Sequence, residues 1–132
     1  MTYPLRATAL ALLLLAGCAT STIDEPVKPA TISLVPGADA PLSSSVTLRF
    51  DSIADSRCPP NVLCVWAGTV AYHFTLSSRK GKEAMRLEMG DSFDSVHLPG
   101  VRIELGSAFP GPVKALGETS SPHPVSLSIV RF

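Results

Sequence analysis

Serine, histidine and acidic side chains are the residues of this sequence that could carry catalysis. No GxSxG, HExxH or glycine-rich phosphate loop surrounds any of them. Ser92, Ser95 and Ser107 have no distinguishing context, and a serine–histidine triad has no fixed spacing that would single one out. Asp91 and Asp94 flank a turn, where solvation explains a pair of carboxylates. We therefore expect no enzymatic activity and no catalytic residue.

Histidine offers a second kind of chemistry, metal binding. His73 and His97 are expected to point outward on strands, and on neighbouring strands they could face each other and bind copper or zinc. His123 lies in a loop flanked by prolines. Scattered surface histidines are the commoner case, and the tight ligand spacing of a zinc site is missing. We predict no cofactor, and keep a copper- or zinc-binding protein as an alternative with His73 and His97 as candidate ligands.

The first eighteen residues have the pattern of an export signal. Arg6 gives a positive start, Ala7 to Ala16 is an apolar run interrupted only by Thr8, and small residues precede Cys18. This order is typical of a secretory signal. The apolar run is shorter than the about 20 residues that a membrane-spanning helix needs.

The segment LAGC, which ends at Cys18, resembles the lipobox of bacterial lipoproteins. The resemblance implies that residues 1–17 are a lipoprotein signal peptide, and that Cys18 carries the acyl chains that anchor the protein in a membrane. Ala19, a residue other than aspartate, implies sorting to the outer membrane. We therefore expect a lipid-anchored location in the bacterial cell envelope, at the outer membrane and facing the periplasm.

Composition limits the remaining chain to one domain. Residues 18–30 are predicted to be the lipidated N-terminus and a flexible tether, because ATSTIDEPVKPA is rich in threonine, proline and charge. The single domain is then 31–132, since about 115 residues are too few for two domains of ordinary size. Without Arg6 the chain has 10 basic and 11 acidic residues. This balance argues against nucleic-acid binding, which uses a concentrated basic face.

Cys58 and Cys64 are predicted to form a disulfide. The sequence has three cysteines, and with Cys18 assigned to lipid these two remain as a pair in an oxidising compartment. Their spacing does not match a CxxC redox pair, and two cysteines are too few for a structural zinc site. Closing the loop CPPNVLC should stabilise the fold by about 2.4 kcal/mol.

The body of the chain alternates apolar and polar residues, as strands with one buried face do. The clearest runs are SVTLRF (45–50), TVAYHFTLS (69–77), AMRLEMG (84–90), VRIELG (101–106) and PVSLSIVRF (124–132). TISLV (31–35) should add a first strand and VKAL (113–116) a short late one. We predict an all-β fold, a small antiparallel β-sandwich of about seven strands, an immunoglobulin-like count, with no assigned topology and one short-range disulfide.

The position of Trp66 follows from the parity of the strand predicted after it. The even-numbered residues of 70–76 should face inward, and the same alternation continued backward puts Trp66 and Cys64 on the inner side. We therefore expect a buried Trp66 close to the disulfide, where it would contribute a large apolar area. Gly68 should mark a bulge or a close approach of two backbone segments.

One segment resembles a recurring element of small bacterial lipoproteins and secreted proteins, with the pattern DSRCP-x4-C-x-W-x-G. It comprises Asp55, Ser56, Arg57, Cys58, Pro59, Cys64, Trp66 and Gly68. The resemblance supports the architecture and implies no chemistry. Asp55 and Ser56 are expected to hydrogen-bond to nearby backbone, and Arg57 to pair with Asp51 or Asp55.

These observations predict a membrane-anchored envelope module that binds another envelope protein, a glycan or a small ligand without turning it over. A second alternative is a module similar to a protease inhibitor that presents the Cys58–Cys64 loop, because a rigid closed loop lowers the ordering cost of binding. The expected partners are the membrane, through the lipid, and one such envelope component.

Overall fold

The computed structural model describes residues 24–132, which form strands and their connections. The predicted signal peptide (1–17), the lipidation of Cys18 and the first part of the tether fall outside these residues. The eight strands are β1 (Ala30–Leu34), β2 (Asp39–Ser43), β3 (Val46–Asp55), β4 (Val70–Ser78), β5 (Gly81–Leu87), β6 (Ser92–Asp94), β7 (Val101–Ala108) and β8 (Val125–Arg131). Over the same part of the chain, no helix has the length and apolar character needed to cross a membrane.

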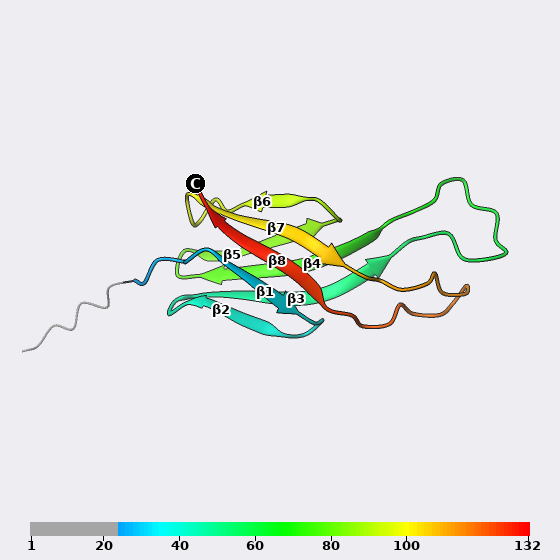
Figure 1. The fold of residues 1–132 in the computed structure, drawn as a ribbon, viewed down its shortest axis with the longest axis horizontal. Helices are drawn as coiled ribbons and strands as arrows, with labels where there is room; N and C mark the ends of the chain where they lie inside the picture. The colour runs from blue at the N-terminus through cyan, green and yellow to red at the C-terminus, as the bar shows by residue number, and fades with distance from the viewer. Residues whose placement is uncertain (1–23) are drawn as a thin grey trace, which may run out of the picture.

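The strands form two four-stranded antiparallel sheets, with the orders β1-β8-β7-β6 and β2-β3-β4-β5. The first and last strands pair along their length, with Ile32 opposite Leu127. Figure 1 shows an elongated molecule whose strands run along its length. The prediction of an antiparallel β-sandwich is confirmed, and the structure supplies the topology that the sequence left open.

The core lies between the sheets and uses the predicted alternation. Its largest fully buried side chains come from both layers: Tyr72, Phe50, Phe74, Leu48, Leu76, Ile103, Leu127 and Val125. Phe50 on β3 stacks on Phe74 on β4 with 4.8 Å between ring centroids, and Tyr72 lies 6.1 Å from Phe50. Aromatic pairs attract at these distances, so this cluster joins the two longest strands.

The strand count differs from the prediction at three places. Residues 113–116, predicted as a short strand, belong instead to the connection 109–124, where they are flanked by Pro112 and Gly117. The strands β2 and β6 were not predicted. β2 contains Pro41 and a bulge at the edge of its sheet, which obscures its alternation, and β6 is too short for a period to show. Met89, predicted to face inward, is exposed because β5 ends at Leu87.

The domain begins earlier than predicted. The tether was expected to extend to residue 30, but Ala30 already pairs with Ile129 in the sheet. Val27 is also part of the core cluster, and Arg131 donates a hydrogen bond to its carbonyl oxygen at 3.3 Å. The packed domain therefore includes residues 27–30, since the extended backbone that Pro26 and Pro29 favour is compatible with docking beside the sheet.

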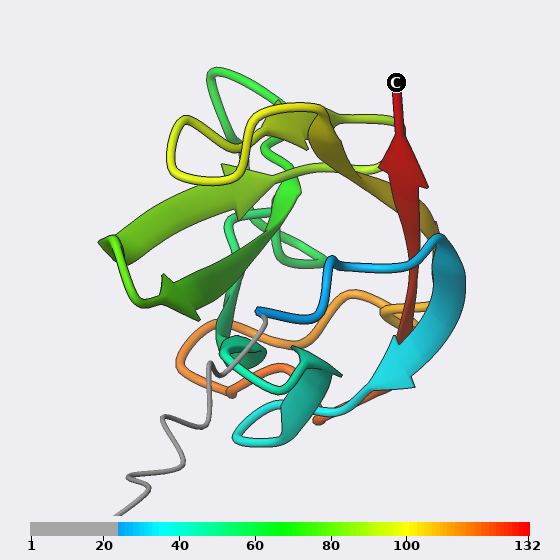
Figure 2. The same ribbon diagram turned by 90° about the vertical axis from the view of Figure 1, so that its left-hand side faces the viewer.

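The connections gather at two ends of the sandwich. The entry end holds the segment that begins at Asp24, the β2–β3 turn and the β4–β5 turn at Arg79 and Lys80. Figure 2 looks directly at this end. The opposite end, called the loop end below, consists of the long connections 56–69 and 109–124 (Figure 1).

Candidate functional site

The loop end contains most of the segment singled out from the sequence. A cleft of about 300 Å³ lies between its two connections, lined by Asp55, Ser56, Arg57, Pro59, Val113, Lys114, Ala115, Leu116, Gly117, Glu118 and Ser120. Polar side chains from both connections face this cleft, and the interactions below fix its walls.

Asp55, the last residue of β3, forms an ion pair with Arg57, and hydrogen bonds from this pair reach the connection 109–124. Arg57 donates from Nη2 and Nε to the carboxylate at 2.6 and 2.9 Å, and from its backbone N–H at 3.1 Å. Arg57 Nη1 also donates to the carbonyl oxygen of Gly111 at 2.9 Å, and Ser120 Oγ donates to Asp55 at 2.6 Å. Of the two predicted partners of Arg57, the structure shows Asp55. Asp51 accepts a hydrogen bond from Thr75 instead.

Acid should weaken the loop end through Asp55, whose side chain is only 8 % exposed. Hydrogen bonds from Arg57, and a further one from Ser120, hold the pKa of Asp55 well below its usual range. They outweigh burial, which acts in the opposite direction. A lowered folded-state pKa gives stability that is present above the unfolded value of about 3.9 and is lost as pH falls through the folded pKa. We expect Asp55→Asn to lower the free energy of unfolding by about 2 kcal/mol at neutral pH, and by progressively less in acid.

Urea unfolding of both proteins across this pH range measures the difference. Asp94→Asn is the control, because Asp94 forms an exposed pair with Arg102 and such pairs contribute under about 1 kcal/mol. Equal stability of Asp55→Asn and the unmodified protein at neutral pH would contradict the assignment.

Ser56 and Gly68 extend the β3–β4 pairing into the connection 56–69. The Ser56 and Cys58 amides donate to the carbonyl oxygens of Thr69 and Ala67, both at 2.9 Å. Gly68 has φ +71°, and a Cβ placed there would lie 1.8 Å from the Ser56 carbonyl oxygen. The expected close backbone approach is therefore confirmed, and only glycine fits it.

Cys58 and Cys64 form the predicted disulfide, with Cα atoms 5.9 Å apart. The ring contains Asn61 at φ +63°, as expected for a turn residue. We expect the double variant Cys58→Ser, Cys64→Ser to lose about 2.4 kcal/mol of unfolding free energy. Urea unfolding with and without a reductant checks this, because reductant should weaken the unmodified protein and leave the variant unchanged. Two alkylatable thiols in the oxidised, folded protein would contradict it.

Trp66 lies in solvent, and the prediction that it enters the core was wrong. Its side chain is 81 % exposed, and the neighbouring Leu63 and Val65 are fully exposed. Alternation cannot be continued backward from β4, because that strand begins at Val70 and the left-handed Gly68 breaks the two-residue period.

The connection 109–124 contributes residues that the sequence did not reveal. Phe109 and Leu116 are exposed, whereas His123 is buried. His123 Nδ1 lies 2.9 Å from the carbonyl oxygen of Ser121, which can only accept, so Nδ1 donates. Nε2 then accepts from the Tyr72 hydroxyl at 2.9 Å, and burial raises the pKa of Tyr72. His123 therefore joins this connection to the core, a contact that its position in a loop flanked by prolines does not predict.

The structure does not bring the two candidate metal ligands together. His73 is on β4 opposite Arg86, whereas His97 lies in the connection after β6 with its ring against Gly81. Gly81 pairs with Ser78. Ser78 is five residues from His73 on the same strand, so the two lie roughly 16 Å apart along β4. In residues 24–132 no group of three histidine, cysteine or acidic residues is placed to hold a metal.

Three of the side chains considered for catalysis, those of Ser95, Asp91 and Asp94, have local contacts in turns and strands. Ser95 donates to Glu83 at 2.5 Å and accepts from the Leu98 amide, and Asp91 accepts from the Glu88 amide. Asp94 pairs with Arg102 across β6 and β7. These contacts give each side chain a local structural role at a distance from the loop-end cleft.

Comparison with known proteins adds no relative: no protein-family model, no curated protein and no solved structure matches the chain.

Proposed function

We propose that this chain is a lipid-anchored protein of the bacterial cell envelope, and that it binds another envelope protein through its loop end without catalysis. One observation carries the binding role. Trp66, Leu63 and Val65 stand in solvent on a connection that a disulfide, an ion pair and backbone hydrogen bonds hold in place.

The exposure of these side chains favours binding over a structural role. Removing apolar groups from water lowers the free energy of the system. Several exposed apolar side chains close together on a surface are therefore typical of an interaction site. Tryptophan is enriched among the residues that dominate binding energy. A connection that is already ordered also loses less conformational entropy when it binds.

A protein partner fits this surface better than a glycan or a small ligand. Leu63 and Val65 are aliphatic and offer no hydrogen bonds to sugar hydroxyls. The adjacent cleft is lined by Asp55 and Arg57, whose charges are satisfied by each other. A protein can cover the apolar connection and place a polar group in the cleft at the same time.

The anchor is supported by the sequence at Cys18 and by the direction of the chain. Asp24 lies at the entry end, opposite the loop end (Figure 1). A lipid on Cys18 would therefore leave the loop end pointing away from the membrane. With Ala19 after the cysteine, we place the protein at the outer membrane, facing the periplasm.

Photocrosslinking in cells tests the binding role. A photoreactive amino acid at Leu63 should give one discrete protein adduct, and the same group at the exposed Ala84 on β5 should give none. No adduct at Leu63, or the same adduct at both positions, would overturn the proposal. An adduct that glycosidases shorten would show that the partner is a glycan. An adduct with a protease would assign the inhibitor-like role.

Labelling with a radioactive fatty acid tests the anchor separately. We expect the label in the unmodified protein and its loss in Cys18→Ser, which should also leave the membrane fraction. A Cys18→Ser variant that keeps the label or stays in the membrane fraction would contradict the anchor.

A further inference from the structure

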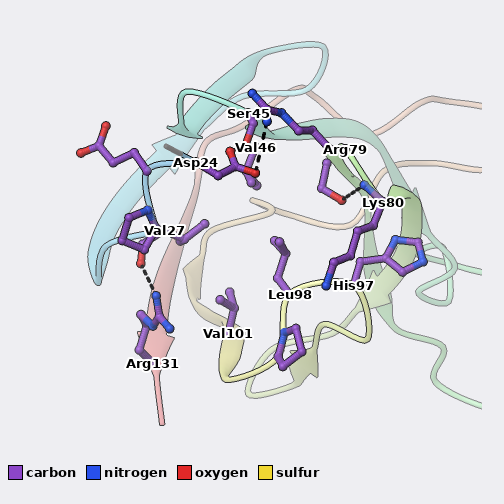
Figure 3. Close-up of a pocket in the computed structure, with 14 residues that line it drawn as sticks. Asp24, Val27, Ser45, Val46, Arg79, Lys80, His97, Leu98, Val101 and Arg131 are labelled. Atoms are coloured by element: carbon purple, nitrogen blue, oxygen red, sulfur yellow. Dashed lines mark hydrogen bonds and ion pairs between the residues drawn. The ribbon is translucent and has the colours of Figure 1, made fainter. Parts of the chain in front are cut away.

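A second cavity, of about 260 Å³, opens at the entry end. Figure 3 shows residues from the entering chain, the two hairpin turns, the β6–β7 connection and the C-terminal strand around it. Its apolar wall includes Val27, Val46 and Val101, all nearly fully buried. The other labelled lining residues are Asp24, Ser45, Arg79, Lys80, His97, Leu98 and Arg131.

The charges around this cavity leave an excess of positive groups. Three cations line it: Arg79, Lys80 and Arg131. Asp24 is 3.8 Å from Arg79 and also accepts from the Ser45 hydroxyl, and Glu25 is paired with Lys28 at 2.5 Å. Among the described residues, the ammonium group of Lys80 has neither a hydrogen bond nor an ion pair. An anion at the mouth would therefore meet one ammonium group that the described residues leave uncompensated, with the guanidinium of Arg79 beside it.

The length of the chain before Asp24 limits how far this cavity lies from the membrane, a step that rests on the proposed lipid anchor. Cys18 precedes Asp24 by six residues, which span at most about 20 Å when fully extended. The cavity is thus within reach of the lipid headgroups around its own anchor, whereas the loop end lies at the far end of the sandwich (Figure 1).

We propose that the entry-end cavity docks an anionic phospholipid of the membrane that carries the anchor. The lipid phosphate lies between Arg79 and Lys80, and the apolar part beneath the headgroup packs on the partly exposed Leu98, with Val27 and Val101 behind it. Charge complementarity selects an anionic headgroup, and the apolar wall distinguishes a lipid from a free anion. This contact orients the domain, so that the loop end faces away from the bilayer.

Vesicle sedimentation of the unlipidated mature chain, residues 18–132 with Cys18→Ser, tests this docking. This chain contains all eight strands and both disulfide cysteines. We expect it to bind vesicles of phosphatidylcholine mixed with an equal part of phosphatidylglycerol, and not vesicles of phosphatidylcholine alone. Binding should fall roughly fivefold for each cation removed, so Arg79→Gln with Lys80→Gln should lose most of it.

A matched variant, Arg49→Gln with Lys114→Gln, removes the same two charge types at positions that do not line the cavity. Equal loss in both variants, or equal binding to both vesicle types, would overturn the docking site. Complete displacement by inorganic phosphate at constant ionic strength would also overturn it, by showing a general anion site.

Mass spectrometry of Cys18 in protein purified from cells distinguishes failure of the docking site from failure of the lipid anchor. A lipidated Cys18, together with an unlipidated chain that ignores anionic vesicles, overturns the docking site alone. An unmodified Cys18 overturns the anchor on which the docking argument rests.

Discussion

Gly68→Ala should release the connection 56–69 and lower the free energy of unfolding by roughly 3 kcal/mol. An alanine at φ +71° pays about 1–2 kcal/mol for the left-handed conformation. Its Cβ would also collide with the Ser56 carbonyl oxygen at 1.8 Å, so the backbone must separate. The Ser56 and Cys58 amides would then lose their hydrogen bonds, which contribute about 1 kcal/mol each.

Hydrogen exchange at these two amides, together with urea unfolding, measures the effect. Protection should be lost at Ser56 and Cys58 and kept at Phe74 in the core. Gly111→Ala is a matched control, because Gly111 has the same φ of +71° with no atom within 4 Å of an added Cβ. It should lose only about 1 kcal/mol. If both variants lost the same unfolding free energy, the close approach of Gly68 to Ser56 would not be the cause.

Trp66→Ala should abolish partner binding while leaving the fold intact. Truncating a tryptophan at the centre of an interface typically costs at least about 2 kcal/mol, which is about thirtyfold in affinity. Because Trp66 is 81 % exposed, the free energy of unfolding should change by no more than about 0.5 kcal/mol. The yield of the Leu63 photoadduct and a urea unfolding curve check the two parts.

Phe132→Ala provides the comparison for this variant. Phe132 is an aromatic residue of similar exposure, and it packs under Arg102 at the C-terminus, away from the loop end. Its truncation should leave the adduct unchanged. Loss of the adduct in Phe132→Ala, or a destabilised Trp66→Ala protein, would show that Trp66 acts through the fold instead.

The alternation of apolar residues predicted the fold because each long strand has one buried face. In β3, Val46, Leu48 and Phe50 are buried as expected, with exposed Arg49 between them. The short β6 and the bulged β2 were missed because three residues, or a shifted register, do not establish a period. Strand order was beyond prediction, since it depends on contacts between residues far apart in sequence.

The candidate site could be predicted only in part. Cysteine count predicted the disulfide, and the turn chemistry of Gly68 predicted a close approach. The position of Trp66 was mispredicted because parity holds only within a continuous strand. The contacts from Ser120 and Gly111 to the Asp55–Arg57 pair join residues more than fifty positions apart, so no local pattern could indicate them.

The segment 55–68 thus divides into two kinds of residue. Asp55, Arg57 and the two cysteines hold the connection, and Gly68 allows its backbone to close. Trp66 makes no comparable contribution to the core, because it is displayed on the outside of the same connection. This division is the basis for assigning binding to the loop end.

Quenching of the fluorescence of Trp66 by acrylamide tests this division most directly, because Trp66 is the single tryptophan in the chain. In the purified domain we predict the long-wavelength emission of an indole in water and quenching close to that of a free tryptophan derivative. Short-wavelength emission that resists acrylamide would place the indole in the interior and contradict the binding role proposed for the loop end.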